Sequence, residues 1–310
     1  MTDSMGVAEL LNATRELIEP AHRAAIDRLS PELRHVAGYH IGWWDAQGRP
    51  RKDGQGRFVR PALALGCARA AGGHAHDAVP MAVATELVND FSLLHDDVID
   101  GDAVRRERPA AWTVFGLSEA LLTGDALLAV AMALVGPAGV RTLADALLDL
   151  CHGQAGDLAF VDRPEVSLAE CMTMAENKTG ALLGAACELG ALAGGAREVH
   201  VFREFGTRLG LAFRLTDDLR RLAADLACRR KSLPVVAALN SGTQVAVLLA
   251  ESLNGEPDPA TEADLVEQTG AREWALREAD RQVELAFAAL GHGATPELRL
   301  LADLSVGRGR

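Results

Sequence analysis

The chain has 310 residues, a net charge of −12, 49% hydrophobic residues and only 4% aromatic ones. The negative charge argues against nucleic acid or an anionic membrane as the main partner, because both are negatively charged themselves. The hydrophobic residues are mostly Ala, Leu and Val, which favour helices and are numerous enough for a large core. Five cysteines without CxxC spacing indicate reduced core thiols, so we expect a cytoplasmic protein.

The hydrophobic pattern predicts helices along the whole chain. The first runs over residues 5–29 with a kink or break at Pro20, and the second runs from Pro31 to about Trp44. After a polar loop at 45–57, the next helix begins near Pro61. Further helices are expected at residues 76–100, 110–136, 138–155, 167–194, 198–225, 242–253, 260–290 and 295–305, with a short one opening after Lys231.

The sequence contains no alternating strand segment, no tandem repeat and no long low-complexity linker. It also contains no run of ~18 apolar residues, and its acidic N-terminus lacks the basic and apolar regions of a signal peptide. We therefore predict an all-α bundle with a single domain over residues 1–310 and no membrane span.

Residues 91–109 contain the strongest functional signal. Asp96, Asp97 and Asp100 end a long apolar helix, and the paired arginines Arg105 and Arg106 follow them. Residues four apart lie on one helix face, so Asp96 and Asp100 point together. Two carboxylates about 6 Å apart repel by roughly 2–3 kcal/mol at an effective dielectric near 20, so the cluster needs a cation. Oxygen ligands favour Mg²⁺, which leaves positions open for phosphate oxygens that the arginines can also bind.

A polar stripe continues from these aspartates along the same helix. Thr85, Asn89 and Ser92 recur at helical spacing on the face of Asp96 and Asp100, whereas most other positions are apolar. A polar stripe on a helix that is buried nearly all round should line a cavity. The simpler alternative is a solvated acidic helix end, but carboxylates at a helix C-terminus oppose the helix dipole.

Two further segments carry charges suited to anions or metal ions. Arg57 and Arg60 stand at a helix N-terminus, where side-chain charge and backbone N–H groups together make an anion site, although ordinary solvated arginines are the alternative. Asp217 and Asp218 end a second long apolar helix. Two such helices facing each other would hold metal ions between them.

These features together resemble the trans-isoprenyl diphosphate synthases, also called the polyprenyl synthetase family, over about residues 35–240. The aspartate block with its arginines is a specific signal, and the weaker motifs occur in the order of the family. The motifs are Gly56-Arg57 with Arg60-Pro61, Phe91-Ser-Leu-Leu-His-Asp-Asp-Val-Ile-Asp with Arg105-Arg106 and Pro109, Thr123-Gly-Asp-Ala, Gly153-Gln154, Lys178-Thr179, and Lys231-Ser-Leu-Pro-Val-Val.

The resemblance implies an all-α bundle around a central active-site cavity, usually a homodimer. It implies a prenyltransferase of isoprenoid biosynthesis that condenses an allylic diphosphate with isopentenyl diphosphate. About three Mg²⁺ would grip the allylic diphosphate, because such ions are held jointly by carboxylates and substrate phosphates. The metal ligands implied are Asp96, Asp97, Asp100, Asp217 and Asp218.

The resemblance also assigns substrate roles. Departure of the allylic diphosphate needs its charge stabilised, and a carbocation must then be kept from water. The catalytic residues implied are Asp96, Asp97, Asp100, Arg105 and Lys178. Residues matched to the allylic diphosphate site are Arg105, Gln154 and Lys178, and those matched to the isopentenyl diphosphate site are Arg57, Arg60, Asn89 and Arg106. Thr179 and Arg214 are further substrate-binding residues.

Product length is expected to depend on Phe91 and its neighbour Ser92. Phe91 lies five residues before Asp96, which is about 7.5 Å deeper along the helix by its rise. By the logic of the family, a bulky ring there floors the apolar shaft and limits the product to about C15–C20, as in a farnesyl or geranylgeranyl diphosphate synthase.

Several residues depart from the pattern of the family. Arg221 replaces the usual third aspartate of the second motif, where it could pair with Asp217. A loop with a Gly-Lys pair is missing after this motif, and Arg214 stands where glutamine is common. Arg57 replaces a lysine, and Asn89 replaces a histidine.

These departures leave two other functions open. One is an isoprenoid-diphosphate cyclase or lyase of the same fold, although the chain lacks the Asn-x-x-x-Ser-x-x-x-Glu motif of ordinary class I cyclases. The other is a non-catalytic subunit that modulates an active prenyl synthase.

Overall fold

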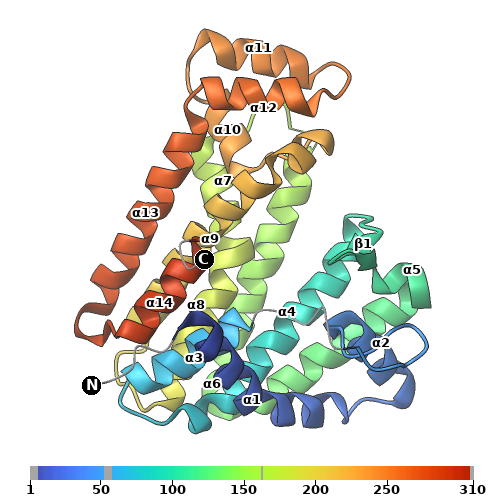
Figure 1. Ribbon diagram of the computed structural model, residues 1–310, viewed down its shortest axis with the longest axis vertical. Coiled ribbons are helices and arrows are strands. Elements are labelled where there is room, and N and C mark those ends of the chain that lie inside the picture. Colours follow the sequence, from blue (N-terminus) through green and yellow to red (C-terminus); the bar gives the residue numbers. More distant parts are fainter. Residues whose placement is uncertain (1–5, 52–57, 162, 308–310) are drawn as a thin grey trace. The chain divides into compact units, whose positions relative to one another are not determined.

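The computed structural model describes residues 6–51, 58–161 and 163–307, and helices form nearly all of its regular structure (Figure 1). The prediction of an all-α protein is therefore confirmed. The helices are α1 Val7–Ile26, α2 Pro31–Ile41, α3 Val59–Ala70, α4 Val79–Ile99, α5 Ala111–Phe115, α6 Leu117–Val161, α7 Leu168–Ala175, α8 Ala181–Ala193, α9 His200–Ala227, α10 Leu233–Leu239, α11 Gln244–Leu253, α12 Pro259–Gln268, α13 Ala271–Leu290 and α14 Pro296–Ser305. Two 3₁₀ turns, Ala75–Ala78 and Gly291–Gly293, and a π turn at Glu176–Gly180 complete the helical elements described.

The chain forms two compact units. The first unit comprises Met1–Leu143 and Ala186–Val199, and the second comprises Ala144–Ala185 and His200–Arg310. Helices α6 and α8 each contribute residues to both units. The single domain over residues 1–310 stays a prediction.

In the first unit, α4 is the central helix of the part that carries the aspartate block. It packs against α1, α2, α3 and α5. Its side chains are buried on several faces, including Leu87, Val88 and Leu94. The sequence predicted that nearly all faces of this helix are buried, and this is confirmed for its first three turns. Its last turn is polar and half-exposed.

Close packing of α8 on α3 uses two glycines four residues apart. A Cβ on Gly190 would lie 2.1 Å from the backbone oxygen of Ala64, and one on Gly194 would lie 2.4 Å from that of Ala68. Real Cβ atoms do not approach that closely, so only glycine allows this helix contact. The small residues seen in the sequence at 167–194 therefore do permit close helix approach.

In the second unit, α9 is the central helix. Helix α13 runs beside it (Figure 1), and α7, α10, α12, α14 and the π turn also contact it. Its buried face joins an apolar core with residues of α6, α10 and α13, among them Leu211, Leu215, Phe160, Val236 and Ala275. This core packs against the part of α9 that carries the second aspartate pair.

Several predicted helix boundaries differ from the structure. Helix α1 continues through Pro20 without ending there. The predicted helix at 260–290 is divided into α12 and α13 by Gly270, whose φ of 80° is left-handed. The predicted break between 136 and 138 is confirmed, because Gly136 has non-helical angles inside α6 and precedes Pro137.

A small β-hairpin is the clearest fold error of the sequence prediction, which contained no strand. Residues Val104–Arg105 (β1) and Arg108–Pro109 (β2) pair antiparallel directly after the aspartate block. Strands of two residues are too short to show any alternation of polar and apolar side chains. The hairpin is nevertheless important, because it positions Arg105.

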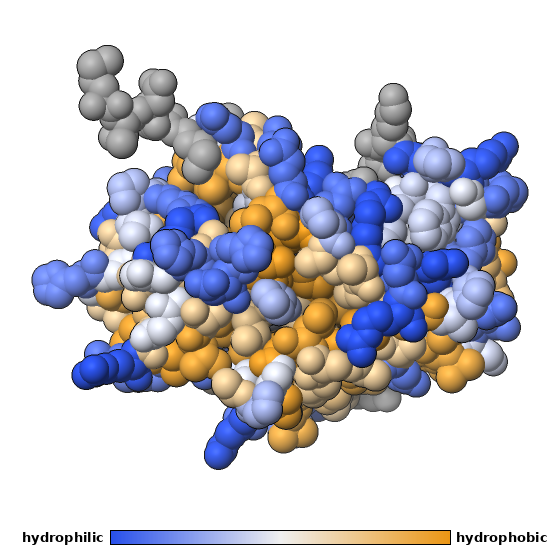
Figure 2. Space-filling view, turned by 90° about the horizontal axis from the view of Figure 1, so that it is seen from below, coloured by the Kyte–Doolittle hydropathy of each residue, from blue (hydrophilic) through white to orange (hydrophobic). Residues whose placement is uncertain are grey.

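Helix α6 is long and apolar enough to cross a membrane by length and composition alone. Only 39% of its most apolar window is buried, and it exposes several large apolar side chains. Core helices of all-helical proteins also have this composition. Figure 2 shows one face of the protein, on which apolar surface is interleaved with charged side chains. The exposed apolar residues of α6 are Leu117, Leu122, Val140, Leu148, Leu158 and Val161.

Gly190→Ala should lower the free energy of unfolding by about 3 kcal/mol or more, because its methyl group meets backbone rather than a movable side chain. Gly6→Ala is the control, since a Cβ there has nothing within 4 Å. Urea denaturation of both variants measures the difference. Equal stabilities of the two variants would show that α3 and α8 can move apart to admit the methyl group without a cost in stability.

Candidate functional site

The three predicted aspartates at the end of α4 differ in how deeply they are buried. Asp96 and Asp100 are half-buried, whereas Asp97 is only 1% exposed. Asp96 and Asp100 are four residues apart, so their carboxylates leave the helix on one face. The structure thus separates an accessible pair from an interior carboxylate.

Asp97 binds Arg105 of the hairpin. The Arg105 Nε donates a hydrogen bond to Asp97 Oδ1 at 2.8 Å, and Nη2 contacts the same oxygen. Burial raises the pKa of Asp97, and the bond from Arg105 opposes that rise. An unpaired buried carboxylate would be costly, so this pair fixes the guanidinium beside the accessible aspartates.

The hairpin is also tied to α2. Tyr39 donates its hydroxyl to the backbone oxygen of Pro109 at 2.8 Å. The Arg108 guanidinium stacks over the Tyr39 ring at 4.2 Å and donates to the backbone oxygens of Tyr39 and Trp44. These contacts hold the loop of Arg105 and Arg106 as a rigid support.

A cluster of ionisable residues, most of them buried, lies near the hairpin in the first unit. It combines Glu86 and Asp90 from α4, His40 from α2 and Arg60 from α3, with Arg106 acting on it electrostatically. Burial and the neighbouring Glu86 raise the pKa of Asp90 to about 8, against the opposing effect of Arg106 and Arg60. Burial lowers the pKa of His40 to about 3, assisted by the hairpin arginines. Both groups are therefore uncharged at neutral pH.

Sequence reasoning placed Arg57, Arg60, Asn89 and Arg106 together and missed the buried acids. Asn89 is 5% exposed, Arg60 is half-buried and Arg106 is exposed. Arg57 lies outside the described residues. The missed signal was Glu86 and Asp90, two acids four apart within an apolar helix.

Phe91 and Ser92 lie on α4 above the aspartates. The Phe91 ring packs against His95 with centroids 4.5 Å apart, and a Cβ on Gly124 of α6 would contact both rings. Ser92 donates its hydroxyl to the backbone oxygen of Asn89, and Thr85 does the same to Ala82. These hydroxyls are satisfied by their own helix, so the polar stripe does not by itself require a cavity.

In the second unit, Lys178 stands on the π turn and forms an ion pair with Asp157 of α6. Its Nζ lies 2.5 Å from Asp157 Oδ2, and both side chains are largely buried. Sequence reasoning predicted Lys178 but assigned no role to Asp157. Thr179 is half-buried beside it, and Gln154, one turn before Asp157 on α6, is buried.

The π turn is held between two glycines. A Cβ on Gly153 of α6 would lie 2.5 Å from the backbone nitrogen of Lys178, and one on Gly210 of α9 would lie 2.6 Å from Cα of Gly180. A π turn inserts an extra residue into a helix and is common at functional sites. The glycines let α6 and α9 approach it, which fixes where Lys178 leaves the helix.

The second aspartate pair is also divided by burial. Asp217 has a one-third exposed side chain, whereas Asp218 is 3% exposed. Asp218 Oδ1 lies 2.6 Å from Arg214 Nε, and its Oδ2 accepts the backbone N–H of Leu233 at 3.0 Å. Burial raises the pKa of Asp218 to about 6, against the effect of Arg214 and of that N–H. Asp218 therefore joins α9 to the N-terminus of α10, where a carboxylate is favoured.

The suggested pairing of Asp217 with Arg221 is not found in the described part of the chain. The ion pair of Asp217 is with Arg220, at a loose 3.9 Å. Arg221 acts instead on Asp225, one turn further along α9. Asp217 and Asp225 both lie four residues from Arg221, and Asp225 is the more buried of the two, so a charge acts on it with less screening by water.

Among the described residues, no group of three or more His, Cys, Asp or Glu side chains converges as a complete metal site. A Mg²⁺ site does not require one, because this ion commonly binds one or two carboxylates together with substrate phosphates. The oxygen donors of Asp96 and Asp100 fit such a site. The two oxygens of Asp218 each already have a partner, Arg214 for one and the backbone N–H of Leu233 for the other, so the role of Asp218 as a metal ligand stays a prediction.

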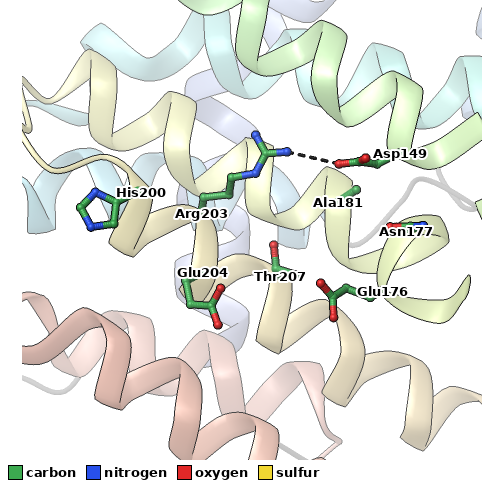
Figure 3. Close-up of a pocket in the computed structure, with 8 residues that line it drawn as sticks. All are labelled: Asp149, Glu176, Asn177, Ala181, His200, Arg203, Glu204 and Thr207. Carbon is green, nitrogen blue, oxygen red and sulfur yellow. Dashed lines mark hydrogen bonds and ion pairs between the residues drawn. The ribbon is translucent and has the colours of Figure 1, made fainter. Parts of the chain in front are cut away.

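A separate cavity of about 420 Å³ opens beside the π turn in the second unit (Figure 3). Arg203 reaches across it to Asp149 at 3.4 Å. None of the residues that line it was predicted from the sequence, so we assign it no part in the candidate site. They are Asp149, Glu176, Asn177, Ala181, His200, Arg203, Glu204 and Thr207.

Comparison with known proteins adds independent evidence. The sequence model of the family described as polyprenyl synthetase matches residues 51–268. The (2E,6E)-farnesyl diphosphate synthase of Mycobacterium tuberculosis is 41% identical over 305 residues, covering 88% of this chain and 84% of that protein. The geranylgeranyl diphosphate synthase of the same organism is 39% identical over 323 residues, covering 95% and 92%. The crystal structure of a polyprenyl synthetase from Streptomyces coelicolor superimposes with a TM-score of 0.91 at 42% identity, covering 97% and 99% of the two chains.

Gly153→Ala should displace the π turn, break the ion pair between Lys178 and Asp157, and cost about 1–3 kcal/mol of stability. Gly156→Ala on the same helix is the control, because its Cβ would make only an ordinary contact of 3.5 Å with Met174. Calorimetry and a crystal structure of each variant measure the two effects. An intact ion pair in the Gly153 variant would contradict the role given to that glycine.

Proposed function

The chain belongs to the polyprenyl synthetase family and has its isoprenoid-synthase helical fold, and we propose that it condenses an allylic diphosphate with isopentenyl diphosphate to give farnesyl or geranylgeranyl diphosphate. Its similarity to synthases of both products, over most of each chain, supports a short-chain prenyltransferase. The observation that carries the proposal is the accessible pair Asp96 and Asp100 beside an arginine that a buried aspartate holds in place.

The allylic diphosphate is bound at the end of α4. Asp96 and Asp100 would hold Mg²⁺ there, and the bound ion would neutralise the charge of the departing diphosphate. Asp97 acts differently, since its contact with Arg105 makes it a positioning residue rather than a direct ligand. Arg105 then presents its remaining N–H groups to the phosphate oxygens.

Lys178 is proposed as a cation for a departing diphosphate. Asp157 orients its ammonium, and Gly153 fixes its backbone. Preorganised positive charge accelerates ionisation because it needs no rearrangement as the negative charge develops. Gln154 and Thr179 add hydrogen bonding groups near this lysine. The apolar side chains of α4, including Phe91, would keep water from the carbocation.

Isopentenyl diphosphate is bound by Arg60 and Arg106, together with Asn89 and with Arg57 from outside the described residues. Arg60 reaches the cluster from the first turn of α3, where backbone N–H groups also favour an anion. The double bond of isopentenyl diphosphate then attacks the allylic carbon. The released diphosphate takes up the proton that the condensed intermediate loses.

The second aspartate motif contributes less to metal binding than three aspartates would. Asp217 is its accessible carboxylate, while Arg214 gives Asp218 a built-in positive partner. Fewer than three Mg²⁺ would then be required in total, and Arg214 is proposed as a substrate-binding residue. This feature also motivates a second candidate function, a non-catalytic subunit that modulates an active synthase.

We further propose a cytoplasmic homodimer in which each chain is one domain. The exposed apolar side chains of α6 support an interface, since large apolar groups on a surface favour association.

Purified protein with Mg²⁺, labelled isopentenyl diphosphate and dimethylallyl, geranyl or farnesyl diphosphate should form C15 or C20 product. Because Mg²⁺ is expected to hold the diphosphate, removing it with a chelator should lower the turnover rate to about a hundredth of its starting value or less. Chromatography of the products measures both. Release of hydrocarbon or alcohol without isopentenyl diphosphate would indicate a lyase or cyclase instead. No turnover alone, but altered products when a partner synthase is added, would indicate the modulating subunit.

Phe91→Ala should lengthen the product by one or more isoprene units, because removing the ring opens space beside His95 and Gly124. Leu93→Ala is the matched control, since residue 93 leaves α4 on a different face. The product distribution of both variants is compared under the same conditions. An unchanged distribution in the Phe91 variant would exclude this ring as the floor of the shaft.

A further inference from the structure

The cluster of His40, Arg60, Glu86 and Asp90 near the hairpin contains buried polar atoms that have no hydrogen bond partner. Buried atoms without a hydrogen bond partner among the described residues include His40 Nε2, Arg60 Nε, Glu86 Oε2 and Asp90 Oδ2. They come from three helices, α2, α3 and α4, and belong to one electrostatic neighbourhood. Native interiors rarely leave such groups unsatisfied, so several together indicate a site completed by a ligand or by its water.

The charge of this cluster depends on one residue. His40 Nε2 lies 3.7 Å from Asp90 Oδ1, and both side chains are less than 5% exposed. Burial, Arg106, Arg105 and Arg108 all disfavour a charged His40. Arg60 and Arg106 stay charged, as arginine does. Ionisation of Asp90 therefore changes the net charge around those two arginines near neutral pH, while His40 does not.

We propose that Asp90 is a positioning residue for isopentenyl diphosphate, which binds Arg60 and Arg106 when Asp90 carries a proton and is displaced when Asp90 becomes a carboxylate. The inference rests on the proposed function of these two arginines. It concerns a residue that neither the motifs nor the comparisons assign.

Competition for the arginines is the physical reason. A protonated Asp90 offers a hydroxyl donor to the nearby imidazole and leaves both guanidinium groups to the diphosphate. An ionised Asp90 is a buried anion, which requires a cationic partner. The neutral His40 cannot be that partner, so Arg60 and Arg106 would turn to Asp90 instead.

The charged and titratable groups acting on Asp90 support this choice of partner. Glu86 lies on the same helix as Asp90, and its negative charge favours the protonated form of Asp90. The other groups that act on Asp90 are Arg60 of α3, Arg106 of the hairpin and His40 of α2. The loop of residues 52–57 lies outside the described part of the chain.

The direction of the pH effect follows from this arrangement. The pKa of Asp90 is raised to about 8, so the acid is protonated at pH 7 and ionised at pH 9. The KM for isopentenyl diphosphate should then rise about tenfold between pH 7 and pH 9, if only the protonated form binds. A bound diphosphate should in turn raise the pKa of Asp90 further, so binding at pH 8 takes up a proton.

The first test is steady-state kinetics from pH 6.5 to 9.5 with the allylic substrate saturating. Wild type should show the rise in KM for isopentenyl diphosphate, and Asp90→Asn, which mimics the protonated acid, should show a flat KM. Asp77→Asn is the matched control, because it removes an exposed carboxylate outside the cluster. The inference is overturned if Asp90→Asn keeps the rise, or if the KM for the allylic substrate rises in the same way.

The second test does not depend on turnover. Calorimetric titration with isopentenyl diphosphate alone at pH 8, in two buffers of different ionisation enthalpy, counts the protons exchanged on binding. Because about half of Asp90 is already protonated at pH 8, wild type should take up about half a proton more than Asp90→Asn. The comparison between the two proteins cancels the titration of the ligand itself. If condensation fails but this difference is found, the proposed function is wrong and the role of Asp90 stands. Equal proton uptake, or no binding to wild type, overturns the inference.

Discussion

The ion pair between Asp97 and Arg105 is the contact on which the candidate site of the first unit depends. It places a buried carboxylate on α4 against a guanidinium from a two-residue hairpin. A carboxylate at this depth is stable only with a partner, so the hairpin cannot leave without a large cost in free energy. This ion pair involves neither Asp96 nor Asp100, whose half-buried side chains lie together on one face of the helix.

The second unit applies the same rule with different residues. Asp218 is buried like Asp97, but its partner Arg214 lies four residues earlier on the same helix, and its other oxygen caps α10. Asp157 in turn requires Lys178, and glycines at 153 and 210 admit the π turn that brings this lysine to it. In both units, an aspartate with little exposed surface is paired with a cationic side chain.

Helix periodicity and the aspartate block predicted the fold class, most helices and the accessible carboxylates, because these depend on spacing within one segment. The partners of the charged side chains could not be predicted in this way. Asp157 lies 21 residues from Lys178, and His40 lies 50 residues from Asp90, so each pairing depends on how helices pack. The hairpin and the π turn were missed because two-residue strands and a single inserted residue barely alter a hydrophobic pattern.

The two aspartate motifs differ in what stands four residues after their first member. In the first motif this position is Asp100, so Asp96 has a second carboxylate on its face. In the second motif it is Arg221, so Asp217 has a cation there instead. A bound cation is attracted by the first arrangement and repelled by the second, since side chains four apart share one surface. Arg214, which stands where the family commonly has glutamine, adds a further positive charge beside Asp218.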